Sequence, residues 1–164
     1  MGNYFMDSSA IIKRYIPEQG QSWIMMLCNP TQGHNIYIAQ ATLVEVIAGI
    51  CRRARERSIT IDARDKFIDE FRRDSQSAYG IQIVNNAVYT LASELCKQHK
   101  LRAYDAVQLA CALRLREKAL ANRALPPIFV CADNDLIAIA AIEGLDIENP
   151  NNLHDQNANN HLDA

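Results

Sequence analysis

The fold is decided by the stretch NYFMDSS, Asn3–Ser9, in which a short apolar run ends on an acid. The apolar run predicts a strand over Asn3–Met6, and the Asp-Ser-Ser that follows it is typical of a helix cap. A second stretch, IFVCAD, Ile128–Asp133, repeats this arrangement of strand and acid late in the chain. Ligands of open α/β sheets bind at the carboxyl ends of the strands. Asp7 and Asp133 are therefore expected at the same edge of one sheet.

Between these two stretches, short apolar segments alternate with segments of helical periodicity. Further strands are expected at residues 36–39, 81–84 and 146–148. Helices are expected at residues 8–15, 21–27, 42–57, 61–77, 86–99, 103–120 and 134–143. Strands that alternate with helices predict an α/β domain whose short central sheet is mostly parallel.

The composition is that of a globular protein. The 164 residues are 49% hydrophobic, and 17 basic against 19 acidic residues give a net charge of −2. This balance excludes a protein that coats nucleic acid over its whole surface, so any nucleic-acid contact has to come from a local basic patch. Residues 1–148 are expected to form one domain. Residues 149–164 are rich in Asn and poor in apolar side chains, which predicts a flexible tail.

The chain is expected to reside in the cytoplasm and to make no membrane span. No apolar stretch approaches about 18 residues, and the N-terminus lacks the charged and apolar regions of a signal peptide. The five cysteines include no pair with C-x-x-C spacing. This pattern favours free, reduced thiols over a disulfide framework or a zinc site.

Four acidic residues stand out because each closes, interrupts or opens a segment of apolar residues: Asp7, Glu45, Asp105 and Asp133. A buried carboxylate is costly unless it is paired or binds a metal. Two carboxylates about 4 Å apart repel by roughly 4 kcal/mol at an effective dielectric near 20, so a divalent cation would hold four of them together. Taken singly, Asp7, Asp105 and Asp133 can be explained as helix caps or first-turn acids. Capping does not explain Glu45, which has apolar neighbours on both sides.

Polar residues next to these acids have simpler explanations. Asp135 is interpreted as a first-turn helix acid or as a support for the site, ahead of direct metal binding. Ser8 and Ser9 can hydrogen-bond the acidic site, although capping of the following helix is the favoured interpretation.

Four segments together resemble the motifs of the PIN-domain nucleases, in particular the VapC-type toxins. They are MDSSAIIKRY at residues 6–15, ATLVEVI at 41–47, RAYDAVQLA at 102–110 and CADNDL at 131–136. No single motif is specific, and the resemblance rests on all four in order, over residues 3–148. The sequence departs from the family at Cys131, because the family often has Ser or Thr two residues before the fourth acid.

The resemblance implies a three-layer α/β/α domain that cleaves RNA with Mg²⁺ or Mn²⁺. Carried over by position, Asp7 and Asp105 would be the main metal ligands, and Glu45 and Asp133 would position a water or a second ion. All-oxygen ligands independently suit magnesium or manganese better than zinc. The resemblance also implies a toxin that pairs with a cognate antitoxin and forms a homodimer.

Basic residues near these motifs are candidates for contact with RNA or with the antitoxin. Lys13 and Arg14 lie in the first motif. Arg52 and Arg53 begin a basic run that continues with Arg55, Arg57, Arg64, Lys66, Arg72 and Arg73. An acidic metal site repels phosphate, so cleavage of RNA requires cations nearby. The simplest alternative for such a run is a solvated helix end with favourable dipole placement.

The same residues bear on three other functions. A non-catalytic binding module would use the acidic pocket to capture a basic peptide, with no need of a metal. A receiver domain or a haloacid-type phosphatase needs a second acid close behind the acid of its first strand. Ser8 and Ser9 occupy those positions, which argues against both of these enzymes.

Overall fold

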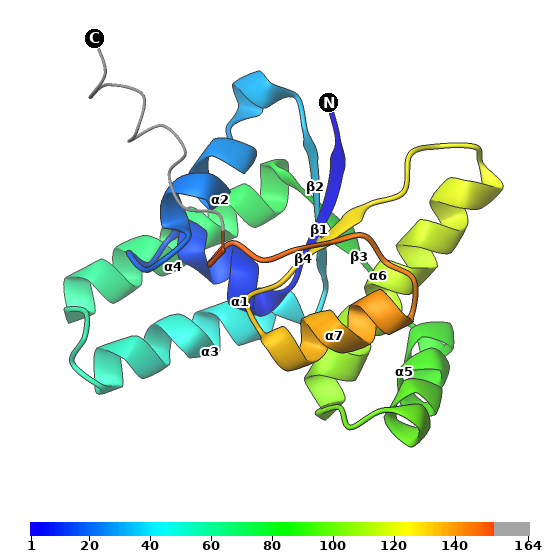
Figure 1. The fold of residues 1–164 in the computed structure, drawn as a ribbon. Coiled ribbons are helices and arrows are strands. Elements are labelled where there is room, and N and C mark those ends of the chain that lie inside the picture. The colour runs from blue at the N-terminus through cyan, green and yellow to red at the C-terminus, as the bar shows by residue number, and fades with distance from the viewer. Residues whose placement is uncertain (153–164) are drawn as a thin grey trace, which may run out of the picture.

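The core of the structure is a sheet of five short strands, whose neighbouring pairs all run parallel (Figure 1). This computed structural model describes residues 1–152. The strands are β1 (Asn3–Met6), β2 (Asn35–Ala39), β3 (Tyr79–Gln82), β4 (Ile128–Val130) and β5 (Ile147–Glu148). Their order in the sheet is β3-β2-β1-β4-β5. Strand β1, which leads into Asp7, therefore lies at the centre of the sheet.

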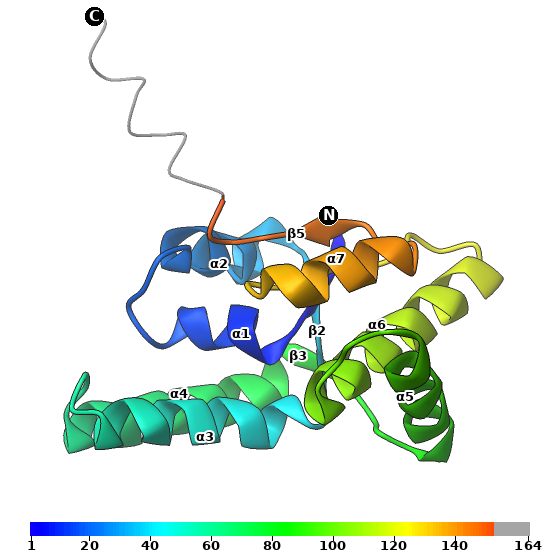
Figure 2. The same cartoon turned by 60° about the horizontal axis from the view of Figure 1, so that its bottom comes forward.

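Helices cover both faces of this sheet (Figure 2). One face is covered by α1 (Ser8–Ile11), α2 (Gln21–Leu27), α3 (Thr42–Arg55) and α4 (Ile61–Ser77), with the short 3₁₀ helices η1 (Ile12–Arg14) and η2 (Pro30–Gln32) beside them in sequence. The other face is covered by α5 (Asn86–Gln98), α6 (Ala103–Ala121) and α7 (Asn134–Ile142). The predicted three-layer α/β/α fold is confirmed. Among the helices of residues 1–152, none combines the length and the apolar character that a membrane span requires.

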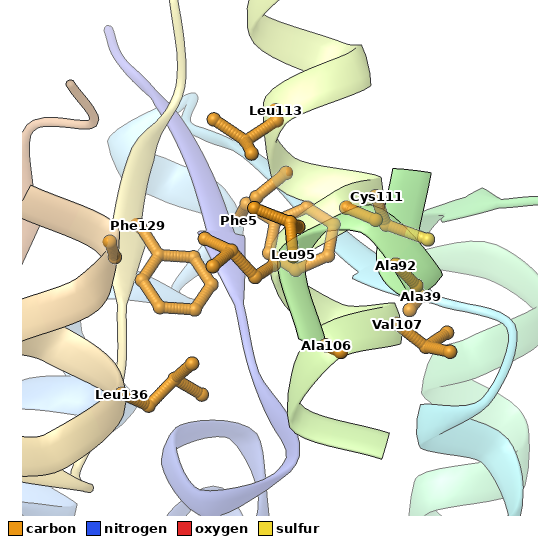
Figure 3. Packing of buried hydrophobic residues seen from close by; sticks show 14 of the residues in the cluster. Phe5, Ala39, Ala92, Leu95, Ala106, Val107, Cys111, Leu113, Phe129 and Leu136 are labelled. Carbon is orange, nitrogen blue, oxygen red and sulfur yellow. The ribbon is translucent and has the colours of Figure 1, made fainter. Parts of the chain in front are cut away.

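Alternate residues of the central strands face the two helical layers, as the pleat of a strand requires. Phe5 and Phe129 point to one face, where their rings stack with centroids 5.9 Å apart, and Figure 3 shows them near Leu136. Met6 and Val130 belong to the buried cluster on the other face. Strands that are buried on both faces are typical of a parallel sheet. The residues that follow β1 and β4 are thereby held in place by the core.

The third strand begins two residues earlier than its sequence pattern predicts. Strand β3 covers Tyr79–Gln82, whereas the pattern predicts residues 81–84. Gly80, which suggests a turn in the sequence, pairs within the sheet with Tyr37. A Cβ atom at position 80 would lie 2.6 Å from Cδ1 of Tyr37. Glycine is therefore required here for the approach of a neighbouring ring rather than for a turn.

Helix α3 ends at Arg55, two residues before its predicted end. Arg57 has a positive φ of 59°. The amides of Arg57 and Ser58 donate to the carbonyls of Ala54 and Arg53, at 3.1 and 3.0 Å. A left-handed residue with such hydrogen bonds ends a helix. The chain then turns into α4, so the arginines at the end of α3 stand at the tip of a helical hairpin.

The packed body continues past Glu148, the expected end of the domain. Pro150 is buried, and a Cβ atom at Gly20 would lie 2.6 Å from its carbonyl oxygen. Gln19 donates from Nε2 to the carbonyl of Asn151 at 2.8 Å. The expected flexible tail otherwise falls on residues 153–164, which lie outside the described residues.

Candidate functional site

Asp7 lies at the carboxyl end of β1 and is buried. Its amide donates to the carbonyl of Val130 at 3.0 Å, which extends the pairing of β1 and β4 up to the acid. Its Oδ1 accepts from the amide of Ala10 at 3.0 Å and from the hydroxyl of Ser9 at 2.8 Å, so Asp7 also caps α1. Burial raises the pKa of Asp7 to about 6, although these donors oppose the rise. The fold thus holds a poorly solvated carboxylate, which a bound cation would stabilise.

Ser9 joins the end of β1 to the segment that follows β4. Its hydroxyl donates to Asp7 and accepts from the amide of Ala132 at 2.9 Å. Asp133, the next residue, caps α7, and its Oδ1 accepts from the amide of Asp135 at 2.9 Å. Asp133 and Asp135 are both exposed. Asp133 therefore lies at the same edge of the sheet as Asp7, and Asp135 lies in the first turn of α7.

Glu45 lies in the first turn of α3 and is tied to α1 and α6 through one carboxylate oxygen. Its Oε2 accepts from the hydroxyl of Ser8 and from Nε2 of Gln108, both at 2.6 Å. The same Nε2 lies 2.8 Å from Oγ of Ser8 and 2.8 Å from Oγ1 of Thr42. Ser8 thus contacts one of the four acids, and Ser9 contacts another.

Gln108, which contacts Glu45, was not predicted from the sequence, and neither was its contact with Thr42. Gln108 interrupts the apolar run AVQLA, residues 106–110, and lies three residues after Asp105. That spacing places both side chains on the same side of α6. The interruption was the available signal, because a polar group in a buried helix face needs a partner. Thr42 gives no such signal, since Thr is ordinary at the start of a helix.

Asp105 lies in the first turn of α6 and is partly buried. Burial raises its pKa, and the charge of Asp133 raises it further. Arg102, at the N-cap of α6, lowers the pKa, and Glu45 raises it. The carboxylates of Asp133 and Glu45 are therefore close enough to act electrostatically on Asp105.

The thiol of Cys131 lies between Ser9 and Asp133. Its Sγ accepts from the amide of Asp133 at 3.3 Å and lies 3.7 Å from Oγ of Ser9. Burial raises the pKa of this thiol far above its usual value, and the charge of Asp7 raises it further. The thiol therefore stays neutral near pH 7 and acts as a hydrogen-bond partner, since a thiolate is the form that binds metals.

The donor set fits a hard divalent cation, but the acids are not yet gathered around one. All four offer carboxylate oxygens, which are the ligands that Mg²⁺ and Mn²⁺ prefer. The two hydrogen bonds to Asp7 come from neutral groups, so neither of them neutralises its charge. As the side chains stand in residues 1–152, no three of type His, Cys, Asp or Glu are close enough to hold a metal ion. Glu45 is held by Ser8 and Gln108 through its Oε2.

Two of the basic residues expected to contact RNA or antitoxin share an internal partner. Lys13 is buried, and its Nζ lies 2.9 Å from Oε1 of Glu18. Arg53 reaches the other oxygen of Glu18 at 2.6 Å. Arg52 is exposed near the end of α3. Of these three cations, Arg52 is the one whose position suits contact with another molecule.

Arg14 belongs to a polar network between η1, α4 and β3. Its Nε donates to Oδ2 of Asp74 at 2.8 Å, and the hydroxyl of Tyr15 donates to the same oxygen at 2.8 Å. The hydroxyls of Tyr15 and Tyr79 lie 2.6 Å apart. These contacts give Arg14 a role in holding helix α4 against the first helices.

An Arg14→Gln substitution is expected to lower the free energy of unfolding by about 1–3 kcal/mol, because the partly buried Asp74 loses its charged partner. Arg52→Gln, the matched loss of an exposed arginine, is expected to change it by less than about 0.5 kcal/mol. Urea denaturation of the two variants measures this difference. Equal stability of both would contradict the structural role of Arg14.

Comparison with known proteins identifies one family and several solved structures. The PIN domain family model matches residues 4–142, a range that contains all four acids. The structure of VapBC2 from Rickettsia felis, bound to a DNA fragment from its promoter, is 16% identical with a TM-score of 0.55, covering 90% of this chain and 98% of that one. A toxin–antitoxin complex from Klebsiella pneumoniae is 16% identical with a TM-score of 0.54, covering 90% and 97% of the two chains.

A third solved structure, FitAcB from Neisseria gonorrhoeae, is 13% identical with a TM-score of 0.54, covering 92% of this chain and 99% of that one. At these identities the likenesses show a shared fold. A search of the curated proteins found no match.

Proposed function

The chain belongs to the PIN domain family, and we propose that it is a metal-dependent endoribonuclease that acts as the toxin of a toxin–antitoxin pair. The observation that carries the proposal is the gathering of carboxylates around Asp105, whose pKa is raised first by burial and further by the charges of Asp133 and Glu45. Asp7 lies at the end of the central strand and is buried, and its hydrogen-bond donors are neutral. Carboxylates that lie close together repel one another and destabilise the fold unless a cation is bound, and with a bound cation they can take part in catalysis.

Each acid has its own part in the proposed reaction. Asp7 and Asp105 would hold the metal, and Glu45 and Asp133 would hold the attacking water or a second ion. A bound Mg²⁺ or Mn²⁺ would supply a more acidic water and stabilise the charge on the leaving oxygen. Ser9 fixes the orientation of Asp7 through its hydrogen bond to Oδ1. These residues together suit hydrolysis of a phosphodiester bond.

RNA is proposed to reach the acids over the exposed end of α3. Arg52, Arg55 and Arg57 are all exposed there. Cations along the path of the RNA offset the repulsion of phosphate by the acids and make binding depend on salt. Because the whole chain has a net charge of −2, this local patch has to supply most of the attraction.

The antitoxin partner is proposed from the neighbours in fold. Two of them are VapBC2 and a toxin–antitoxin complex. We extend that partnership to this chain, together with a homodimeric state and a cytoplasmic location. Static light scattering of the protein alone, and with the product of the adjacent reading frame, would test the first two.

Cleavage of total bacterial RNA by the purified protein tests the proposal directly. Discrete cuts are expected with Mn²⁺ or Mg²⁺ and none with a chelator. Sequencing of the new 5′ ends would identify the RNA and the position of the cut. Absence of cuts by antitoxin-free protein that binds Mn²⁺, across RNA of several sources, would overturn the nuclease assignment.

A second function, capture of a basic peptide without catalysis, is favoured by one observation. Within residues 1–152 the acids are not gathered closely enough to hold a metal as they stand. Titration calorimetry separates the two functions, because the nuclease has to bind Mn²⁺ and a peptide-binding module does not. Loss of Mn²⁺ binding in Asp105→Asn would favour the nuclease.

A further inference from the structure

Gln108 is a buried polar side chain at the meeting point of α1, α3 and α6. It is 2% exposed, and its neighbours along α6 are apolar. Its Nε2 lies 2.6 Å from Oε2 of Glu45, 2.8 Å from Oγ of Ser8 and 2.8 Å from Oγ1 of Thr42. An amide nitrogen has two hydrogens, so three oxygens compete for two donors. The carboxylate is the strongest acceptor of the three.

The other end of the same amide is unsatisfied. Oε1 of Gln108 is buried and has no hydrogen-bond partner within residues 1–152. A buried polar atom without a partner lowers stability, and a methionine of similar length would fill the space without that cost. Turning the amide round would place Oε1 against Oε2 of Glu45, two acceptors with no hydrogen between them. The amide is therefore oriented by Glu45.

Both donors to Glu45 bind the same carboxylate oxygen. The hydroxyl of Ser8 and the amide of Gln108 each lie 2.6 Å from Oε2. Two hydrogen bonds on one oxygen fix the plane of the carboxylate and leave Oε1 of Glu45 as the atom that can face an ion or a water. Outer hydrogen bonds of this kind orient metal ligands and tune their strength.

We infer that Gln108 is a positioning residue for Glu45: its amide holds the carboxylate in the orientation that the nuclease reaction needs. This inference rests on the proposed function. Gln108 does not touch substrate or metal, and it acts through Glu45. The competing explanation is a structural staple, in which the amide simply joins α6 to α1 and α3.

The test compares Gln108→Met with Thr42→Val. Gln108→Met removes one donor from Glu45 and also removes the unsatisfied oxygen. Thr42→Val removes one partner of Gln108 and leaves both donors of Glu45 in place. Gln98→Met, at an exposed position of α5, is the control for replacing a glutamine with a methionine away from the site.

A positioning residue predicts a loss of catalysis that exceeds the loss of stability. Gln108→Met is expected to reduce kcat about 10- to 100-fold, as for other residues that support metal ligands. The KM for RNA is expected to change by less than about threefold, because Gln108 makes no contact with the phosphate-binding surface. The Tm is expected to shift by no more than about 4 °C. Thr42→Val and Gln98→Met are expected to keep kcat within about threefold of wild type.

A purely structural role of Gln108 predicts different effects of the substitutions on kcat and Tm. Equal losses of kcat in Gln108→Met and Thr42→Val, or a fall in Tm with kcat unchanged, would overturn the inference. Binding of Mn²⁺ provides a readout apart from cleavage, since Gln108→Met is expected to weaken it about 10-fold or more. If the wild type binds Mn²⁺ but cuts no RNA, the proposed function fails, while the metal affinities still decide the role of Gln108. If Gln108→Met changes neither kcat nor the affinity for Mn²⁺, the inference fails by itself.

Discussion

An Asp7→Asn variant is expected to cleave RNA at least about 10³-fold more slowly than the wild type, with its fold intact. The substitution removes the charge that would hold the metal. The amide oxygen of Asn can still accept from the amide of Ala10 and the hydroxyl of Ser9, so the cap of α1 survives. A loss of about 4 kcal/mol in transition-state stabilisation corresponds to this factor, at roughly 1.36 kcal/mol per tenfold.

Single-turnover cleavage with saturating enzyme measures this effect apart from product release. Asp105→Asn is expected to show a similar loss. Asp69→Asn, at an exposed acid of α4, is the matched control and is expected to stay within about twofold of wild type. Cleavage at the wild-type rate by Asp7→Asn would remove Asp7 from the site and would refute the mechanism proposed for it.

The same variant is expected to be more stable than the wild type when metal is removed. Burial raises the pKa of Asp7 from 3.8 to about 6, so the folded protein holds this proton more tightly than the unfolded chain does. The stability that comes from Asp7 is fully present below pH 3.8 and is lost as the pH rises through about 6. Above that pH the ionised carboxylate costs up to about 3 kcal/mol, at roughly 1.36 kcal/mol per pKa unit. Asn carries no charge and avoids this cost.

Thermal denaturation in a chelator, from about pH 4 to about pH 8, measures the difference between variant and wild type. The gain in Tm of Asp7→Asn is expected to be largest at the high end and to shrink towards the low end. Added Mn²⁺ is expected to stabilise the wild type far more than the variant, because an ion that binds the folded state favours it. A variant that is less stable than wild type at pH 7.5 would show that the charge of Asp7 is well accommodated without metal.

The central part of the fold could be predicted from the sequence because its signals are local. Strand β1 has the predicted bounds, Asn3–Met6, since a short apolar run is followed directly by a capping acid. Helix α4 also has its predicted bounds, Ile61–Ser77, with Thr60 as the cap. The placement of Asp7 and Asp133 at one edge followed from the parallel pairing of their strands.

The features that could not be predicted depend on contacts between distant segments. Strand β3 begins earlier than predicted because Gly80 lies in the sheet against the ring of Tyr37, a contact that the local sequence pattern does not reveal. The pairing of Arg14 with Asp74 joins residues that are far apart in sequence. Gln108 was missed for the same reason, since its partners lie on α1 and α3.

The central place of β1 in the sheet also determines when its two neighbouring strands can pair with it during synthesis. Strand β1 pairs with β2, which is made soon after it, and with β4 through Tyr4–Ile128 and Phe5–Phe129. Pairing between segments so far apart in sequence forms late in folding. A growing chain therefore has Asp7 and Glu45 long before it has Asp133. Until β4 has been made, the chain lacks both the neighbour of β1 on that side of the sheet and the fourth carboxylate of the proposed site.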